Sequence, residues 1–431
     1  MSMEKVISYV NTNRGDGQKG SLDRLYTLLK KLGNPHKNLK YIHITGTNGK
    51  GSTASMFQSI FRETNLTVGL FTSPHLEVVN ERIRLNGENI TDADFIRLVD
   101  KIEPYVLELE QQLNQKYYAF ELLTAVAFLY FQEKQPDIVL LEAGIGGRLD
   151  STNVIEESEV SIITSIGLDH VSTLGETLED ILYEKVHILK DNGRLILGPI
   201  NEQLKPIANH WAEQVNGTVT FLNKDEISIH ESSLGQQVFS YKNWENVKIT
   251  LLGLHQIENA SLVLEACEQL IHKGWPLEKE TIYRGLEKAS WPGRFEKVFN
   301  KPLFYMDGAH NEASVKRMVE TLETTFTDQK FYFVLGMMKD KNYTKMIQQV
   351  EHLAKAFYLV SPDWQRGFDV KEVANNLLTA GYKATAMEHC EEVLDLIQNE
   401  IPKDGTVIQF GSLYLVGEMK QTLQARKNKT K

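Results

Sequence analysis

Cysteine is scarce in this chain. Only Cys267 and Cys390 occur among 431 residues, and both fall in segments whose apolar spacing predicts helices. Two isolated thiols can build neither a disulfide framework nor a thiolate metal site, because both need several cysteines at short spacings. We therefore expect a protein of a reducing compartment, the cytoplasm.

Membrane-spanning hydrophobic runs and excess positive charge are also missing. Residues 1–10 lack the basic segment and apolar stretch of an export signal, and no run of about 18 apolar residues follows. The net charge is −10, whereas a general binder of nucleic acid or membrane surfaces needs basic faces that neutralise phosphates. We expect neither nucleic-acid nor membrane partners, so an anionic substrate must be held by local groups.

The residues that are present predict a globular α/β protein. A chain of 431 residues is long enough for two or three domains. From Lys40 onward, short apolar runs alternate with segments of helical periodicity. The predicted strands are 41–45, 67–71, 137–142 and 161–166, with helices such as 53–63 and 120–133 between them. Such alternation predicts a doubly wound, mostly parallel sheet with helices on both faces.

The pattern of apolar residues changes between residues 216 and 252. Apolar and polar positions alternate at 219–222, 238–241 and 247–252, which predicts a small antiparallel β-region. Beyond an interruption at Trp291–Phe295, strands and helices again alternate. The predicted strands are 303–306, 331–335, 356–360, 384–387 and 406–410, and the predicted helices include 313–324 and 370–380. We therefore predict one domain over residues 1–297 and a second, Rossmann-like α/β domain over residues 298–431.

The densest chemical signal is a glycine-rich segment that follows a predicted strand and precedes a predicted helix. Its glycines let successive N–H groups point inward, and the helix N-terminus adds partial positive charge. The spacing departs from the usual P-loop, because Gly51 separates Lys50 from Ser52 and only two residues separate Gly46 from Gly49. A turn without a ligand is the alternative. We predict a variant P-loop for ATP, formed by Thr47, Asn48, Gly49, Lys50, Gly51 and Ser52.

Three other predicted strands end in polar residues. Ser73 follows the second strand, Glu142 ends the third, and His170 follows the fourth. Ligands bind beyond the carboxyl ends of strands in open parallel sheets, so these side chains are candidates for Mg²⁺ or phosphate. Each also has a plain structural interpretation: a turn, a helix cap and a hydrogen-bonded histidine. An imidazole is moreover an unusual ligand for Mg²⁺.

Further short motifs continue along nearly the whole chain. They are Leu22-Asp23-Arg24, Leu32-Gly33-Asn34-Pro35, Thr72-Ser73-Pro74-His75-Leu76, Glu142–Asp150 with Thr152-Asn153, Gly167-Leu168-Asp169-His170, Glu184-Lys185, His255-Gln256, Asn259-Ala260, Pro292-Gly293-Arg294, Asp307-Gly308-Ala309-His310-Asn311 and Gly411-Ser412-Leu413-Tyr414. Together with the Gly46–Ser52 loop, this ordered set resembles folylpolyglutamate synthases, including bifunctional dihydrofolate synthases, within the Mur ligase superfamily.

The resemblance implies roles that spacing does not supply. Lys185 resembles the family's carbamylated lysine, in which CO₂ added to the amine makes a carboxylate-like metal ligand. One Mg²⁺ would be bound by Ser73 and Glu142, and a second by Glu142, His170 and modified Lys185. Without the resemblance, Lys185 would be interpreted as a surface lysine on an amphipathic helix. Lys50, His170 and Lys185 are accordingly the predicted catalytic residues.

The resemblance also assigns contacts with the substrates. Asn259 would contact adenine, Arg294 the phosphates and Asp307 the ribose. The residues implied in substrate binding are Ser73, His75, Arg82, His310 and Ser412, of which His310 and Ser412 would make glutamate-side or inter-domain contacts.

The activity implied by the resemblance is ATP-dependent ligation of L-glutamate to a folate-type carboxylate through an acyl phosphate, releasing ADP and phosphate. The substrates would be ATP, L-glutamate and a folate or dihydropteroate. We expect a monomer that closes about a hinge near residues 294–301. The sequence leaves open whether the chain extends glutamate tails, makes dihydrofolate, or does both.

Two other functions are weighed against this one. A cell-wall Mur ligase acting on a nucleotide sugar would need an extra domain of about 100 residues, for which the 45 residues before Gly46 are too few. A nucleotide-dependent switch would bind ATP without ligation.

Overall fold

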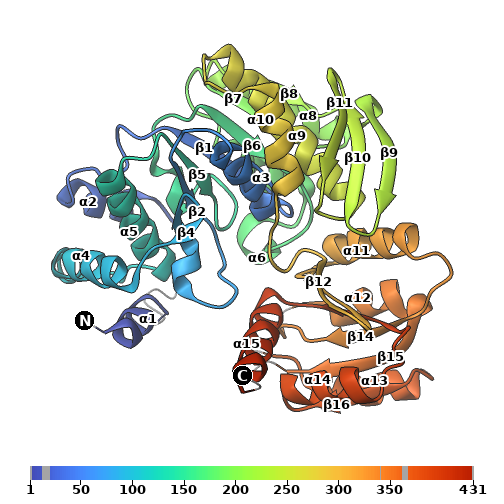
Figure 1. Ribbon diagram of the computed structural model, residues 1–431. Helices are drawn as coiled ribbons and strands as arrows, with labels where there is room; N and C mark the ends of the chain where they lie inside the picture. The colour runs from blue at the N-terminus through green and yellow to red at the C-terminus, as the bar shows by residue number, and fades with distance from the viewer. Residues whose placement is uncertain (1, 12–19, 340, 362–366, 430–431) are drawn as a thin grey trace. The chain divides into compact units, whose positions relative to one another are not determined.

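A computed structural model describes residues 2–11, 20–339, 341–361 and 367–429, which form two compact units (Figure 1). The first unit comprises Met1–His230, Val238–Thr250 and Gln256–Ser290, and the second comprises Glu231–Gln237, Leu251–His255 and Trp291–Lys431. The domain boundary at residue 297 stays a prediction, because compactness alone does not define a folding domain.

The first unit is built on an eight-stranded sheet of order β4-β3-β2-β5-β1-β6-β7-β8. Its strands are β1 (Tyr41–Thr45), β2 (Val68–Phe71), β3 (Ile83–Leu85), β4 (Glu88–Asn89), β5 (Ile138–Glu142), β6 (Val160–Ile163), β7 (Arg194–Leu197) and β8 (Thr218–Phe221). All neighbours from β2 to β8 are parallel, while β3 and β4 add an antiparallel edge. Every residue of β1 and β5 is buried, as expected for strands covered on both faces. The predicted α/β class is confirmed.

The helices of this unit pack on the sheet or on one another, because their apolar faces need a partner. The helices are α1 (Met3–Asn11), α2 (Asp23–Lys31), α3 (Lys50–Arg62), α4 (Asp92–Leu113), α5 (Ala119–Lys134), α6 (Val171–Leu174), α7 (Leu178–Val186), α8 (Lys205–Gln214), α9 (Leu254–His272) and α10 (Lys279–Lys288), with short 3₁₀ turns η1 (Val79–Arg82), η2 (Ser151–Val154), η3 (Glu202–Leu204) and η4 (Lys224–Glu226). Helix α3 packs on α10, and α4 packs on α5 (Figure 1).

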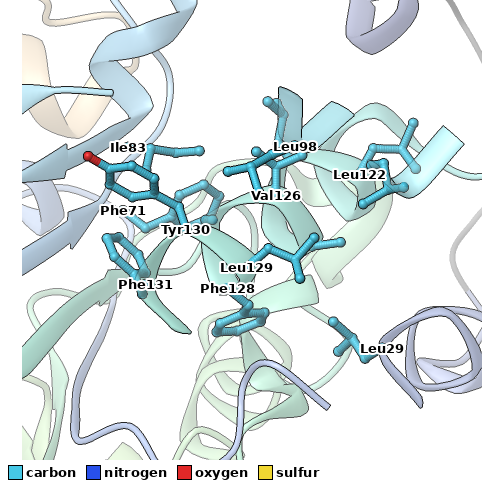
Figure 2. Close-up of a cluster of buried hydrophobic side chains, with 14 of the residues drawn as sticks. Leu29, Phe71, Ile83, Leu98, Leu122, Val126, Phe128, Leu129, Tyr130 and Phe131 are labelled. Atoms are coloured by element: carbon cyan, nitrogen blue, oxygen red, sulfur yellow. The ribbon is translucent and has the colours of Figure 1, made fainter. Parts of the chain in front are cut away.

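Helix α5 forms the centre of one hydrophobic core. Eleven consecutive residues, Glu121–Phe131, are buried, because its sequence is apolar on almost every side. Figure 2 shows Phe128, Leu129 and Phe131 of this helix among side chains from neighbouring elements. This layer also includes Tyr41 of β1 and Val139 and Leu141 of β5.

One predicted strand orientation was wrong. Residues 219–222 were assigned to the antiparallel β-region, but β8 pairs in parallel with β7 at the edge of the main sheet. The reason is the crossover helix α8, which returns the chain to the same end of the sheet. The apolar-polar alternation arose because an edge strand is only partly covered. A separate three-stranded sheet, of order β11-β10-β9, contains β9 (Ile227–Ser233), β10 (Gln236–Tyr241) and β11 (Trp244–Ile249).

The second unit has a six-stranded sheet of order β12-β13-β17-β14-β15-β16. Its elements are β12 (Glu296–Asn300), β13 (Leu303–Met306), α11 (Glu312–Thr325), β14 (Phe331–Leu335), α12 (Tyr343–Val350), η5 (Glu351–Leu353), β15 (Ala354–Val360), α13 (Val370–Thr379), β16 (Ala384–Met387), α14 (Cys390–Asn399), β17 (Thr406–Phe410) and α15 (Leu413–Lys429). Five strands are parallel, and β12 is antiparallel to β13. Most of the segment expected to be a hinge, 294–301, is therefore hydrogen-bonded into a sheet.

Among the described residues, no helix is long and apolar enough to cross a membrane. Both cysteine thiols are buried and unbonded to each other.

The α5 core yields a test of the packing. The ring of Phe128 is fully buried and lies edge-on to Tyr41 of β1, with ring centroids 6.1 Å apart. We expect Phe128→Ala to lower the free energy of unfolding by about 3–5 kcal/mol, through lost burial and a residual cavity. Urea denaturation followed by tryptophan fluorescence measures this. The control Leu107→Ala, at a site 48% exposed, should change it by less than about 0.5 kcal/mol. Equal effects would contradict the assignment of this core.

Candidate functional site

The loop between β1 and α3 folds tightly because of its glycines. Gly46 and Gly49 have φ angles of 150° and 90°, in the region that favours glycine. A Cβ on Gly46 would overlap the Thr164 hydroxyl, and a Cβ on Gly49 would lie 2.5 Å from Oδ1 of Asn259. The loop therefore has no room for side chains at these two positions. Gly49 is the N-cap of α3, so the loop leads directly into the helix N-terminus.

Hydroxyl groups after β6 hold the same loop from the side. Thr164 Oγ1 donates to the carbonyl of Asn48 at 2.6 Å, and the Asn48 N–H donates to Ser165 Oγ at 3.0 Å. The hydroxyl of Thr47 contacts both the N–H and the carbonyl of Gly167 at 3.0 Å. The sequence interpretation missed Thr164 and Ser165, although the signal was present: two hydroxyl residues directly follow a buried strand.

Lys50 and Ser52 occupy the first turn of α3. The Lys50 ammonium folds back on the loop and donates to the carbonyls of Gly46 at 2.9 Å and Thr47 at 3.3 Å. The buried Ser52 hydroxyl accepts a hydrogen bond from Gln256 Nε2 at 3.2 Å.

A pair of amides on α9 completes this side of the loop. Asn259 donates to Gln256 Oε1 at 3.0 Å, and both side chains are buried. The predicted adenine contact, Asn259, is thus packed on Gly49, and Gln256 is an additional residue that spacing did not indicate.

Glu142 and Ser73 meet at neighbouring strand ends. β5 lies between β1 and β2, so the last residue of β5 faces the residues that follow both partners. The N–H of Ser73 donates to Glu142 Oε2 at 3.3 Å, and Glu142 is 3% exposed. The Thr45 hydroxyl donates to the Gly146 carbonyl at 2.5 Å, which ties the glycine-rich loop to the segment after Glu142.

That segment, 143–150, is closed by Asp150. Its Oδ2 accepts the N–H groups of Gly144 at 2.9 Å and Ile145 at 3.0 Å. Arg148 then binds Glu184 through Nε at 3.0 Å and Nη2 at 2.7 Å, which anchors the segment to α7. The residue next to Glu184 is Lys185.

Lys185 is buried, which corrects the plain interpretation of a surface lysine. Its side chain lies on α7 and is 2% exposed. Burial, together with the nearby charge of Lys50, lowers the pKa of Lys185 from 10.5 to about 7, against the opposing charges of Asp169, Asp150 and Glu184. A substantial fraction of this amine is neutral and nucleophilic near neutral pH.

His170 differs from these buried residues in its exposure to solvent. It is the N-cap of α6, has a φ of 50°, and is exposed to solvent. Within the ranges that the structure describes, no three His, Cys, Asp or Glu side chains are gathered as a metal-binding group. The predicted set therefore comprises one close pair, Ser73 with Glu142, a buried amine and an exposed imidazole.

His75 and Arg82 contact each other on the segment after β2. Arg82 Nε donates to His75 Nδ1 at 2.9 Å, so the histidine nitrogen is the acceptor. Burial, with the adjacent charge of Arg82, lowers the pKa of His75 to about 4. His75 is therefore neutral at physiological pH, with its proton on Nε2.

In the second unit, Asp307 is enclosed after β13. Its carboxylate accepts the N–H groups of Phe295 and Ala309, both at 2.8 Å. Burial raises the pKa of Asp307 above its ordinary value, while the positive charge of nearby Arg294 and the two hydrogen bonds oppose this shift. Asp307 thus organises its own loop in this structure.

His310 and Ser412 lie on loops of the same unit. His310 Nδ1 contacts the Gly308 carbonyl at 2.8 Å, and its N–H donates to Ser314 Oγ at 3.0 Å. Ser412 is buried, and its hydroxyl accepts the Tyr414 N–H at 3.1 Å at the beginning of α15. The backbones of the two loops are joined, because the Gly411 N–H donates to the Ala309 carbonyl at 2.7 Å.

Comparisons with known proteins agree with this architecture. The Mur ligase middle domain matches residues 44–267, and the Mur ligase glutamate ligase domain matches residues 293–413. The folylpolyglutamate synthase of Thermotoga maritima has a solved structure with a TM-score of 0.85 and 32% identity, covering 98% of this chain and 96% of that one. A solved complex of a folylpolyglutamate synthase with AMPPCP and folate has a TM-score of 0.85 and 29% identity, covering 98% of this chain and 100% of that one.

Among sequence relatives, the dihydrofolate synthase/folylpolyglutamate synthase of Bacillus subtilis is 35% identical over 431 residues, covering 97% of this chain and 98% of the relative. These findings confirm the resemblance that the motifs indicated. This chain belongs to the folylpolyglutamate synthase/dihydrofolate synthase family of the Mur ligase superfamily.

Proposed function

We propose that this protein is an ATP-dependent ligase that joins L-glutamate to the carboxylate of a folate, releasing ADP and phosphate. The observation that carries the proposal is the Gly46–Ser52 loop at the strand ends of a parallel sheet, beside Glu142, in a chain similar to folylpolyglutamate synthases over its full length. Relatives named for this activity, and a relative solved with AMPPCP and folate, support the substrate classes.

ATP is needed because a carboxylate is a poor acyl donor, since its leaving group would be oxide. Phosphorylation of the substrate carboxylate by the γ-phosphate makes an acyl phosphate, and ADP leaves. This step depends on positioning and on electrostatic stabilisation. The Gly46–Ser52 loop and the N-terminus of α3 would contact the phosphates, and Lys50 would exchange its contacts with the loop carbonyls for contacts with phosphate oxygens.

The donor set near this loop fits Mg²⁺. Glu142 contributes a buried carboxylate, and the Ser73 and Ser52 hydroxyls are oxygen donors of the kind that Mg²⁺ prefers. His170 is the least suitable member, since it is exposed and presents nitrogen. Bound Mg²⁺ would neutralise charge on the transferred phosphoryl group. The proposal of a second metal site on Glu142, His170 and Lys185 depends on the state of Lys185.

The burial of Lys185 supports its proposed carbamylation. A neutral amine adds to CO₂ and loses a proton, which converts a nitrogen into a carbamate with two oxygen donors. The lowered pKa makes the reactive form abundant near neutral pH, whereas an ordinary lysine would be almost fully protonated. Arg148 fixes Glu184, the preceding residue, and so holds this part of α7 against the segment after Glu142.

In the second step the amine of glutamate attacks the acyl carbon, and phosphate leaves. The attacking amine must be neutral, and the developing oxyanion needs positive partners, a role for which we propose the half-buried Lys50 of the loop. The nucleotide contacts of Asn259, Arg294 and Asp307, and the substrate contacts of His75, Arg82, His310 and Ser412, stay predictions, as do the monomeric state and the cytoplasmic location.

The extent of the activity is a further proposal. The Bacillus subtilis relative carries both names, dihydrofolate synthase and folylpolyglutamate synthase, so we propose that this chain also accepts dihydropteroate. Incubation with ATP, Mg²⁺ and glutamate against dihydropteroate and a reduced folate separately, with products resolved by mass, distinguishes the two activities.

ADP release tests the ligase function directly. Because phosphorylation precedes amide formation and needs the acceptor carboxylate, sustained ADP release should require both glutamate and a folate or dihydropteroate. Coupled detection of ADP with each substrate omitted in turn measures this dependence. Hydrolysis of ATP that continues at an unchanged rate without either substrate would instead favour the nucleotide-dependent switch.

Gly49→Ala tests the phosphate loop. The new Cβ would meet Asn259 Oδ1 at 2.5 Å, so the loop or the amide must shift. We expect the KM for ATP to rise by about tenfold or more, since such strain costs about 1–3 kcal/mol. Gly274→Ala is the matched control, because its φ of 89° is nearly the same and nothing lies within 4 Å of its Cβ. An unchanged KM for ATP in Gly49→Ala would argue against ATP binding here.

Lys185→Ala tests the carbamate. We expect kcat to fall by about 100-fold with an unchanged fold, because metal-ligand losses have effects of this order. In the wild type, the neutral amine fraction rises between about pH 6 and pH 8, so bicarbonate should activate depleted enzyme more at the higher pH. ¹³C-bicarbonate labelling should give a carbamate resonance that Lys185→Ala lacks.

Lys190→Ala controls for the loss of a buried amine. Its Nζ donates to the Asn153 carbonyl at 3.0 Å, and burial lowers the pKa of Lys190 to about 8. This variant should keep both the resonance and the bicarbonate response. Wild-type rates from Lys185→Ala would remove the carbamate from the mechanism.

A further inference from the structure

The segment between β2 and η1 is organised around a single carboxylate. Glu81 accepts three consecutive backbone N–H groups: Leu76 at 2.9 Å on Oε2, and Glu77 at 2.8 Å and Val78 at 2.9 Å on Oε1. Successive N–H groups that point to one side form a concave anion site, which here is filled by the protein's own side chain.

The same segment carries residues assigned to substrate binding. Ser73 at its beginning donates its N–H to Glu142, and His75 accepts a hydrogen bond from Arg82, the residue that follows Glu81. The Thr72 N–H donates to the Arg82 carbonyl at 3.0 Å, which closes the base of the segment. His75 and Arg82 therefore belong to one segment whose tip, residues 76–78, is attached through Glu81.

Apolar packing contributes little to the tip. Pro74 is exposed and Val78 is 49% exposed, so neither buries enough surface to define the backbone course. Hydrogen bonds to a charged acceptor are the stronger kind, and three of them converge on Glu81. The position of the tip is thus decided by the charge and reach of this side chain.

Arg84 forms a loose ion pair with the same carboxylate. Its Nη2 lies 3.9 Å from Glu81 Oε2, and burial lowers the pKa of the Arg84 guanidinium, while Glu81 opposes that shift. An amide at position 81 would offer a single acceptor oxygen, would turn N–H groups toward other N–H groups, and would leave Arg84 without this counter-charge.

We propose that Glu81 is a positioning residue for the folate-type substrate, holding residues 74–78 in the conformation that presents His75 and Arg82. This role rests on the proposed function. ATP binding should be independent of it, because the Gly46–Ser52 loop is held by residues after β6 and on α9. Ser73, the proposed metal ligand, is attached separately to Glu142.

Hydrogen exchange of the wild type and two variants tests the attachment itself. Glu81→Gln removes the charge, and Glu81→Asp keeps the charge near Arg84 but shortens its reach by one methylene. Both should accelerate exchange of the Leu76, Glu77 and Val78 amides by about tenfold or more, the factor expected for losing a hydrogen bond to a charged acceptor. Glu88→Gln, an exposed carboxylate on neighbouring β4, is the matched control and should leave these amides unchanged.

Steady-state kinetics then test the positioning role. Both Glu81 variants should raise the KM for the folate or dihydropteroate substrate by about tenfold or more, and leave the KM for ATP within about twofold. Exchange rates at residues 76–78 equal to those of the wild type would overturn the attachment. Faster exchange with an unchanged KM for the folate substrate would overturn the positioning role.

The two readouts also separate this inference from the proposed function. Exchange is measured without substrates, so it remains informative if the wild-type protein shows no ligation. A variant that fails to fold is recognised by fast exchange in β1 and β5, and Glu81→Asp, which keeps the counter-charge for Arg84, then carries the test.

Discussion

Parallel pairing of β1 with β5 on one side and β6 on the other is the constraint on which the candidate site depends. Parallel strands end at the same edge of a sheet, so Thr45, Glu142 and Ile163 deliver three loops to one place from positions far apart in the chain. Each loop then bonds to its neighbour: Thr45 to Gly146, and Thr164 to Asn48. The site is therefore a property of strand order rather than of any one motif.

Exclusion of water changes the properties of the polar side chains at this edge of the sheet. Glu142, Ser52 and Lys185 are all nearly inaccessible to water, and burial lowers the pKa of Lys185 despite the opposing charges of Asp169, Asp150 and Glu184. In a low-dielectric setting the same groups interact more strongly with a bound anion or cation than they would at the surface. The hydrophobic layer around α5 includes Tyr41 of β1 and Val139 and Leu141 of β5, the strands that end at this edge.

A recurring device in both units is a side-chain carboxylate that closes a loop by accepting backbone N–H groups. Asp150, Glu81 and Asp307 each bind at least two such groups. This arrangement fixes backbone conformation where glycine and exposed residues provide little packing. Some acidic residues in functional motifs therefore stabilise the backbone of their own loop. A carboxylate in such a motif does not by itself identify a ligand of a metal or substrate.

Local sequence was sufficient for the element types, because periodicity reports which faces are buried. Predicted strands 41–45, 331–335 and 406–410 coincide with β1, β14 and β17, and the predicted helix 53–63 falls within one residue of α3 at its C-terminal end. Full-length resemblance was sufficient for the family. The orientation of β8 was predicted wrongly because pairing depends on the connection, not on the alternation within the strand.

The tertiary structure alone decided which side chains meet. Thr164 and Ser165 bind Asn48, and Gln256 binds Ser52, across more than 100 positions of the chain. The burial of Lys185 depends on which residues pack over its face of the helix. A sequence pattern reports the period of burial but not the partner. For that reason the tight glycine-rich turn between β1 and α3 could be predicted from its own residues, whereas the burial of Lys185 and the loop-closing carboxylates emerged only when the strands were placed side by side.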